Sequence, residues 1–365
     1  MAPINIRSMT PHDRKAVLAM MRRSFPVFEQ LFFSLTESTL VAESEGRLLG
    51  AIVLKVFKLP DKTQGGVVNW IFSDPSARGL GVGQVLIEAG LAWLEEAGCT
   101  RVFAIVEGFN TSSSKLFATR GFSILPFREQ RRRFGLFGLL QVWLASFHVT
   151  DVGHFLWGKP AAVLPDKPRQ QFLWTLILNL LAAALVVWRW WGFRQPDLTA
   201  LWALPAVTLM LIELRTIVMT LAARKQGVDL QFRMWESGFN LSLPLALLFG
   251  FYFPVPGGLY LKQPLWRYRD RIPEFGRIGL AGALPTLLLS WTLILLRYFI
   301  PSSPWVGTMF NAMFQGAYFF AIFDILLVFF PFVSFNGRRI WDWNKLTWLV
   351  CALAVVALFI VDRFI

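Results

Sequence analysis

Cysteine and histidine, which form cross-links and bind zinc, are scarce in this sequence. It has 2 cysteines and 3 histidines among 365 residues. Cys99 and Cys351 lie in different halves of the chain, so a disulfide framework and a cysteine metal site are both excluded. The N-terminal stretch MAPINIRSMT lacks the apolar core of a signal peptide. We therefore expect an uncleaved N-terminus that stays in the cytosol.

Charged residues are also few, and their placement is uneven. They make up 16% of the chain, against 55% hydrophobic residues, and the net charge is +13. The basic residues gather at the ends of apolar segments, as at 131–133, 224–225, 267–271 and 338–339. Basic cytosolic ends that face anionic lipid are typical of membrane proteins, so we expect membrane lipids, and not nucleic acid, as partners.

Long apolar segments dominate the chain after about residue 130. A spanning helix needs about 20 residues, and five segments reach or approach that length: 172–191, 198–223, 278–300, 306–330 and 346–360. Residues 241–253 are shorter and run into a stretch rich in proline and glycine, which favours a re-entrant hairpin. The basic residues fall mostly on one side of these spans. This predicts an integral membrane protein with a cytosolic N-terminal domain and a C-terminus on the opposite side.

The first part of the chain has short alternating segments instead. Residues 1–127 are expected to form an α+β domain with a mixed sheet flanked by helices. Residues 128–171 are expected to be a basic hinge with an interfacial helix at 134–147 and a linker at 161–171. Residues 172–365 are expected to form an all-α polytopic membrane domain.

A glycine-rich turn joins the apolar strand 67–72 to a helical pattern that ends at residue 97. Glycine lets backbone N–H groups come close to an anion, and a helix N-terminus adds partial positive charge. The turn therefore predicts a phosphate site that several nucleotide-containing ligands would fit. Its residues are Arg78, Gly79, Leu80, Gly81, Val82 and Gly83.

The turn resembles the pyrophosphate-binding turn of the GNAT-type N-acetyltransferase superfamily. Residues 110–122 are similar to that family's second signature, and the resemblance covers residues 3–126. It implies a domain that binds acetyl-CoA or another acyl-CoA. The cofactor-binding residues that it implies are Phe72, Ser73, Arg78, Gly79, Leu80, Gly81, Val82, Gly83, Asn110 and Phe117.

The catalytic groups of this domain are less clear. Glu107, at the end of the strand 102–106, is the best candidate for a general base, and an exposed strand-end carboxylate is the alternative. The family often has a tyrosine acid where this chain has Phe117, and a phenyl ring cannot protonate a thiolate. Asp74 is expected to cap the turn. His148, Asp151 and His154 have a helical spacing that would suit a metal, although polar anchoring beside the membrane is favoured.

Four ordered stretches of the second half, at 222–227, 253–256, 281–284 and 331–340, resemble the site-2 protease family of intramembrane zinc proteases. That family binds zinc through His-Glu-x-x-His and an aspartate. Counting back from Gly227 without gaps puts Arg215 and Met219 at the histidine positions and Thr216 at the glutamate. The resemblance of residues 331–340 puts Asn336 at the aspartate. An alternative register uses Glu213 as the glutamate, but it supplies no histidine either. We therefore expect no zinc and no protease activity.

Arg215 needs a partner, because an unpaired charge inside an apolar helix is costly. Glu213 and Asp324 are the candidates, and we expect an Arg215–Asp324 ion pair across the position of the missing metal. A structural ion pair is the favoured interpretation. A site for a substrate or a lipid headgroup is the alternative.

Two functions remain open at this point. One is a membrane-anchored acyl-CoA-dependent N-acyltransferase that acetylates an amine of a membrane-associated protein or lipid. The other is a catalytically inactive scaffold or assembly factor for a membrane protein complex. The intact glycine turn favours the enzyme, whereas Phe117 and the lost zinc ligands favour the scaffold.

Overall fold

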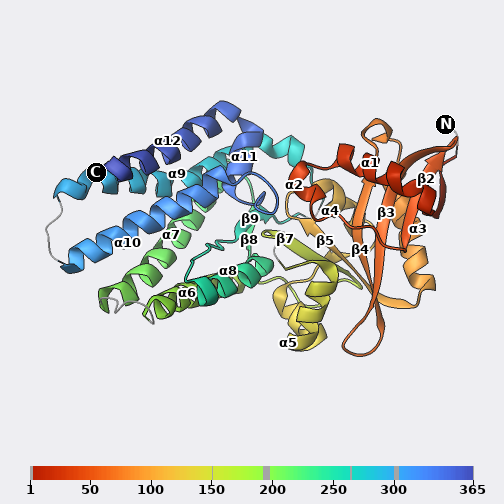
Figure 1. Ribbon diagram of the computed structural model, residues 1–365, viewed down its shortest axis with the longest axis horizontal. Helices are drawn as coiled ribbons and strands as arrows, with labels where there is room; N and C mark the ends of the chain where they lie inside the picture. Colours follow the sequence, from red (N-terminus) through yellow and green to blue (C-terminus); the bar gives the residue numbers. More distant parts are fainter. Residues whose placement is uncertain (1–2, 150, 192–197, 264, 300–303, 365) are drawn as a thin grey trace. The chain divides into compact units, whose positions relative to one another are not determined.

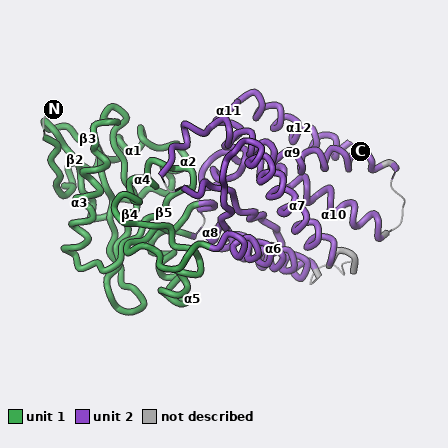
Figure 2. Tube along the Cα trace, turned by 180° about the vertical axis from the view of Figure 1, so that it is seen from behind, with its two compact units in different colours: residues 1–148, 154–166 green, residues 149–153, 167–365 purple. Residues whose placement is uncertain are grey.

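The chain folds as two units (Figure 2). Unit 1 comprises Met1–His148 and His154–Asp166, and unit 2 comprises Val149–Gly153 and Lys167–Ile365. The computed structural model describes residues 3–149, 151–191, 198–263, 265–299 and 304–364.

Unit 1 is built on a mixed sheet in the order β1-β2-β3-β4-β5-β7-β6 (Figure 1). The pair β4–β5 is parallel and the other neighbouring pairs are antiparallel. This confirms the predicted mixed sheet flanked by helices. The strands are β1 (Asn5–Ser8), β2 (Thr39–Ser44), β3 (Arg47–Lys58), β4 (Gln64–Ser73), β5 (Cys99–Glu107), β6 (Ser123–Ile124) and β7 (His154–Lys159).

The helices of unit 1 are η1 (Pro11–Asp13), α1 (Arg14–Ser24), α2 (Val27–Gln30), η2 (Pro75–Ala77), α3 (Val82–Glu96), α4 (Thr111–Ala118) and α5 (Phe127–Ser146). The longer helices, α1, α3, α4 and α5, each bury some of their residues, whereas η1 and α2 bury none. Val17, Met20 and Met21 of α1 pack in one core cluster with Phe72 of β4. Helix α3 comes very close to the sheet, because a Cβ on Gly66 would lie 2.7 Å from Leu94. These contacts fix where β4 ends and α3 begins.

Strand β7 was not predicted from the sequence, and it lies between β5 and β6 in the sheet. Helix α5, expected from the sequence as an interfacial segment, buries Phe134, Val142 and Trp143 with Phe103 of the sheet. The residues on the other side of α5 are exposed, including Phe137 at 93%. Its contact with a membrane interface stays a prediction.

Unit 2 is a helical bundle with one short β-hairpin (Figure 1). Five of its helices are long and apolar enough to span a membrane, as predicted: Pro168–Trp190, Trp202–Lys225, Tyr268–Leu296, Trp305–Leu326 and Lys345–Phe364. Its elements are α6 (Pro168–Trp191), α7 (Leu198–Lys225), β8 (Leu230–Arg233), α8 (Glu236–Phe249), β9 (Gly258–Leu261), η3 (Tyr268–Arg271), α9 (Ile272–Leu296), η4 (Arg297–Phe299), α10 (Pro304–Ala321), the π-helical turn η5 (Ile322–Leu326), α11 (Asn336–Trp343) and α12 (Lys345–Phe364).

Helix α7 packs against α6, α9 and α10. Its core residues include Val207, Leu211 and Ile212, which pack with Ala317 and Phe320 of α10. The β8–β9 hairpin pairs segments on either side of α8, from Leu230↔Leu261 to Arg233↔Gly258. The hairpin was not predicted. Its second strand follows Gly257, whose carbonyl points into the buried network described below.

Candidate functional site

The predicted glycine turn lies between η2 and α3. Gly79 and Gly81 have φ angles of 85° and 78°, which side chains rarely adopt, and Gly81 is the N-cap of α3. Gly83 lies in the first helical turn, and no atom lies within 4 Å of where its Cβ, or that of Gly79, would be. Gly79 and Gly81 therefore allow the backbone angles of the turn, and the missing side chain of Gly83 leaves open space at the start of α3.

The backbone amides of this turn are available to an anion. Gln84 and Val85 donate to the Gly81 carbonyl at 2.9 and 3.2 Å, which closes the first helical turn. In the described part of the chain, no hydrogen bond uses the N–H groups of Gly81, Val82 or Gly83. Arg78 is exposed immediately before them. Free amides, a helix N-terminus and an arginine together suit a pyrophosphate.

Strands β4 and β5 separate beside this turn. They are paired from Gln64↔Cys99 to Val68↔Ala104. Beyond that point β4 stays paired only with β3, up to Gly50↔Ser73, and β5 only with β7, up to Glu107↔His154. Asn69 is an extra residue in β4 at the point of separation, where the β3–β4 register shifts. The end of β4 thus has a strand edge free for an extended ligand arm.

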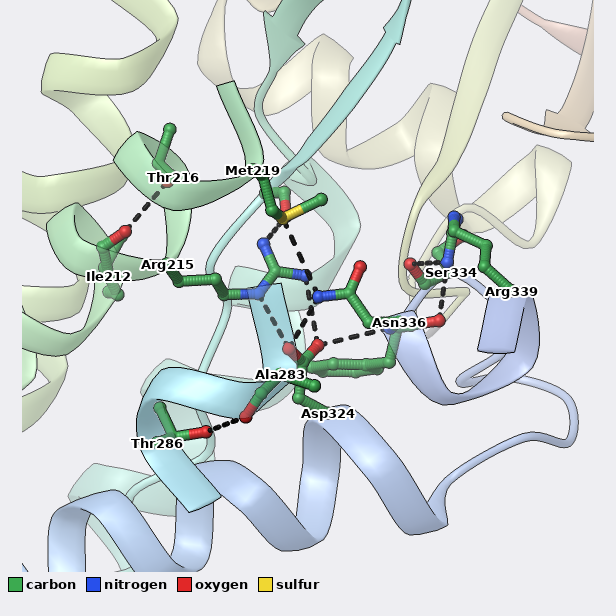
Figure 3. A network of polar contacts seen from close by, with 12 residues as sticks. Ile212, Arg215, Thr216, Met219, Ala283, Thr286, Asp324, Ser334, Asn336 and Arg339 are labelled. Carbon is green, nitrogen blue, oxygen red and sulfur yellow. Dashed lines mark hydrogen bonds and ion pairs between the residues drawn. The ribbon is translucent and has the colours of Figure 1, made fainter. Parts of the chain in front are cut away.

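The second cluster of functional interest lies inside unit 2, around Arg215 on α7 (Figure 3). Arg215 is 1% exposed and Asp324 of η5 is fully buried. Nε and Nη2 of Arg215 each donate to one carboxylate oxygen of Asp324 at 3.0 Å. The third nitrogen, Nη1, donates to the carbonyl of Gly257 at 3.2 Å. The predicted Arg215–Asp324 pair is confirmed.

Asn336, at the start of α11, completes this network (Figure 3). Its Nδ2 donates to Asp324 at 2.6 Å and lies 3.7 Å from the sulfur of Met219. Its backbone N–H also donates to Asp324, at 3.2 Å. Gly282 of α9 allows this approach, since a Cβ there would lie 2.6 Å from Met219 and 2.7 Å from Asn336. The positions counted as metal ligands, held by Arg215, Met219 and Asn336, thus meet in space.

The chain resembles known proteins in both halves. A model of the acetyltransferase (GNAT) family matches residues 12–122. The N-terminal unit is a GNAT acetyltransferase domain. A mycothiol acetyltransferase of Salinispora tropica is 34% identical over 103 residues, which are 28% of this chain and 32% of that protein. A solved structure described provisionally as a phosphinothricin N-acetyltransferase is 29% identical, with a TM-score of 0.29, and the match covers 33% of this chain and 84% of that one.

The remainder of the chain is similar to a protein of Methanocaldococcus jannaschii, provisionally named as a zinc metalloprotease. It is 33% identical over 139 residues, which are 37% of this chain and 66% of that protein. The chain spans just under two thirds of this relative's length and about a third of the mycothiol acetyltransferase's. Unit 2 is a site-2 protease-like membrane domain, and the assignment of Arg215, Met219 and Asn336 to metal-ligand positions stays a prediction.

Three other residues that were predicted to bind the cofactor cap a helix or pack in the core of the GNAT domain. Asn110 caps α4, where its Oδ1 accepts from the backbone N–H of Ser113 at 3.2 Å. Phe117 is 2% exposed and its ring packs edge-on to Phe122. Phe72 is buried beside Phe25 and Phe33. Phe72 can therefore meet a ligand only through its backbone, and the cofactor roles of Asn110 and Phe117 stay predictions.

The carboxylates near the strand ends differ in their surroundings. Asp74 accepts from the Ser76 hydroxyl at 2.6 Å and from Arg23 at 2.6 Å. These hydrogen bonds, from Ser76 first and Arg23 second, hold the pKa of Asp74 well below its ordinary value. Asp74 caps η2, as predicted. Glu107 is half-buried at the end of β5, where its Oε2 accepts from the N–H of Phe109 at 2.8 Å. Its role as a base stays a prediction.

His148, Asp151 and His154 do not share one helical face, so the less favoured metal-binding alternative is wrong. Helix α5 ends at Ser146, His148 follows in a turn, and His154 begins β7. His148 is buried, and its ring packs edge-on to Trp143 in the GNAT domain, while Asp151 belongs to the membrane domain. The described residues contain no group of three or more His, Cys, Asp or Glu side chains arranged to hold a metal ion.

Proposed function

We propose that the protein is a membrane-anchored N-acetyltransferase that uses acetyl-CoA or another acyl-CoA. The observation that carries this proposal is the glycine turn, whose free amides lie beside the separated ends of β4 and β5. The turn fits a pyrophosphate, since it offers free N–H donors and open space at Gly79 and Gly83. The mycothiol acetyltransferases among the relatives of the GNAT domain support the same class of reaction.

In this proposal each part of the site has a separate task. The amides of Gly81, Val82 and Gly83 hold the pyrophosphate with Arg78, and the free edge of β4 at Phe72 and Ser73 aligns the pantetheine arm. The bound acyl-CoA supplies an activated acyl thioester. Glu107 takes the proton of the attacking amine, directly or through water. The phenyl ring of Phe117 offers no proton to the thiolate, so the thiolate leaves unaided or is protonated by water.

The acceptor that we propose is an amine of a membrane-associated protein or lipid. The GNAT domain continues within a few residues into α6, the first candidate span, so it cannot diffuse far from the membrane. In this proposal the domain lies on the cytosolic side and the C-terminus on the opposite side, which the basic residues at the span ends support. Cofactor binding is assigned to residues 1–127 and membrane insertion to residues 172–365. Residues 128–171, which the sequence predicts as a hinge, fold largely within unit 1 as α5 and β7, and in this proposal the exposed side of α5 contacts the interface.

Calorimetric titration of acetyl-CoA into the purified protein tests this proposal. The substitutions Gly81→Asp and Gly83→Asp place a negative charge where the pyrophosphate sits, so we expect affinity to fall at least tenfold. Gly98→Asp is the matched control, because Gly98 has a φ of 76° and open space around its Cβ at the other end of α3. Gly83→Ala, at a position with open space, should bind nearly as the wild type does.

The competing function is an inactive scaffold for a membrane complex. Phe117 in place of an acid and the loss of every zinc ligand favour it. A wild type that binds no acetyl-CoA, and releases no thiol with a panel of amines, would replace our proposal with this one. Binding that both aspartate substitutions abolish, together with thiol release, would exclude it.

A further inference from the structure

Glu213 is an exposed carboxylate on a helix that is long and apolar enough to span a membrane. It lies near the middle of the span Trp202–Lys225, about 17 Å from either end at the helical rise of about 1.5 Å per residue. Its side chain is exposed, and no described residue forms a hydrogen bond or an ion pair with it. Lipid headgroups do not reach this depth, since the apolar core of a bilayer is about 30 Å thick.

The exposed residues around Glu213 on α7 are apolar. The exposed residues that share its face at spacings of three and four are Trp202, Ala206, Met210, Ile217 and Leu221. We call these five residues and Glu213 the outer stripe of α7. Arg215 and Met219 point to the opposite side, into the buried network. The expectation that Glu213 is an alternative partner for Arg215 is therefore wrong, because Arg215 is already paired with Asp324.

A carboxyl group in hydrocarbon needs a partner whether it is ionised or protonated. Its lost hydrogen bonds to water are costly, and a charge costs more still. Ionisable residues within spans therefore mark contacts with other polar groups. Because the described part of this chain supplies no such group, the partner comes from another molecule. We propose that the outer stripe of α7 docks a transmembrane helix of another membrane protein, which carries a basic side chain at mid-depth.

A second copy of this chain fits the stripe poorly. Copies related by an axis normal to the membrane face each other at equal depth, so Glu213 would meet Glu213 or apolar residues. Arg215 is the basic residue nearest the same depth in α7, and it is buried in its own ion pair. The other basic residues of the described spans lie nearer to the span ends. Charge complementarity thus favours a different protein. The inference does not depend on the activity of the GNAT domain.

Energy transfer in lipid vesicles that contain the full chain tests this proposal. The probes are two dansyl-labelled helical peptides of leucine and alanine, one with a single central lysine and one with leucine in its place. Transfer from the protein's tryptophans to the dansyl group reports association. We expect the lysine peptide to bind the wild type roughly tenfold more tightly than the leucine peptide does. Glu213→Leu should remove this preference.

Gln315→Leu is the matched control, because Gln315 is an exposed polar residue near the middle of the span Trp305–Leu326 on α10. It should keep the lysine preference. Glu213→Leu makes the stripe wholly apolar, so the variant is expected to fold, and tryptophan fluorescence and gel filtration check this. Equal binding of both peptides by the wild type overturns the proposal. Self-association of the wild type that Glu213→Leu abolishes overturns it too, in favour of a second copy.

Discussion

The glycine turn of the GNAT domain and the buried network of the membrane domain are the two places where the sequence predicted a site. In the turn, every position that needs a bare backbone is still glycine, and the amides at the start of α3 have no protein acceptor in the described chain. In the network, the ligand positions hold Arg215, Met219 and Asn336, yet their side chains still meet around Asp324. The turn has the glycines and free amides that a phosphate site needs. The network brings the predicted ligand positions together, but the residues there are not zinc ligands.

This difference shows that the position of a site and its chemistry depend on different features. The position follows from how α7, α9 and α11 pack, including the close approach that Gly282 allows. Chemistry depends on which atoms stand at that point. Here the Arg215 guanidinium supplies positive charge to Asp324, so the buried carboxylate has a partner. The network then joins three elements without offering a reactive group.

Breaking the network should have the largest effect. Arg215→Met leaves Asp324 buried with only Asn336 as a donor, so we expect about 3–5 kcal/mol of destabilisation of the membrane domain. Thermal unfolding of the detergent-solubilised protein, followed by tryptophan fluorescence, measures this. The double variant Arg215→Met/Asp324→Leu should recover much of the loss, because no unpaired charge remains.

The control for this prediction is Arg297→Met at the rim of the bundle. Arg297 pairs with Asp362 at 3.2 Å, and both side chains are partly exposed. Such a pair contributes about 0–1 kcal/mol. Equal losses in Arg215→Met and Arg297→Met, or a double variant no more stable than Arg215→Met, would contradict a buried ion pair that replaces the metal.

Both places could be predicted from the sequence, but for different reasons. Local rules decide the glycine turn, whereas the buried network follows from the need of Arg215 for a partner. Strand, glycines and helix follow one another within residues 67–97, so the turn needed no distant information. The Arg215–Asp324 pair spans 109 positions, but a buried charge must find a partner, and few candidates existed. The gapless count back from residues 222–227 singled out Met219, and the resemblance of residues 331–340 singled out Asn336, which the structure brings together.

Strand β7 and the β8–β9 hairpin could not be predicted in the same way. The six residues of β7 pair with β5, about fifty positions earlier, and nothing local distinguishes them from the end of an apolar segment. The hairpin joins two four-residue strands across α8. Helix α5 was predicted as apolar, but its burial against Phe103 depends on the sheet that β7 completes. Long-range pairing decides all three.

Replacing a buried carboxylate in the GNAT domain should destabilise the protein less than breaking the Arg215–Asp324 pair does. Glu129 of α5 is fully buried and accepts from Arg132 at 2.7 Å and from Arg133 at 2.7 Å. These arginines, Arg132 first, lower the pKa of Glu129 to about 2. Because Arg132 is half exposed to water, we expect Glu129→Gln to cost only about 1–2 kcal/mol at pH 7. Hydrogen exchange of α5 measures this, with exposed Glu96→Gln as the control.

The pH dependence of this contribution has a definite sign. The native pKa of Glu129, about 2, lies below its unfolded value of about 4.3. The stabilisation is therefore complete above about pH 5 and is lost as the pH falls through the native pKa. The difference in exchange between wild type and Glu129→Gln should be constant from pH 5 to 7 and should shrink by pH 3. A difference that grows on acidification would contradict the ion pair.

The smallest expected effect concerns Asn110. Substitutions there distinguish a structural role in capping α4 from a functional role in binding the cofactor. Its Oδ1 caps α4 by accepting from Ser113, so Asn110→Ala should cost about 1 kcal/mol, measured by hydrogen exchange of α4. Asn110→Asp keeps a capping oxygen and adds a charge that favours a helix N-terminus, so α4 should stay intact. If Asn110 also contacts the cofactor, Asn110→Asp loses the amide donor, and we expect acetyl-CoA affinity to fall about two- to tenfold. Unchanged affinity with an intact α4 would show that Asn110 only caps the helix.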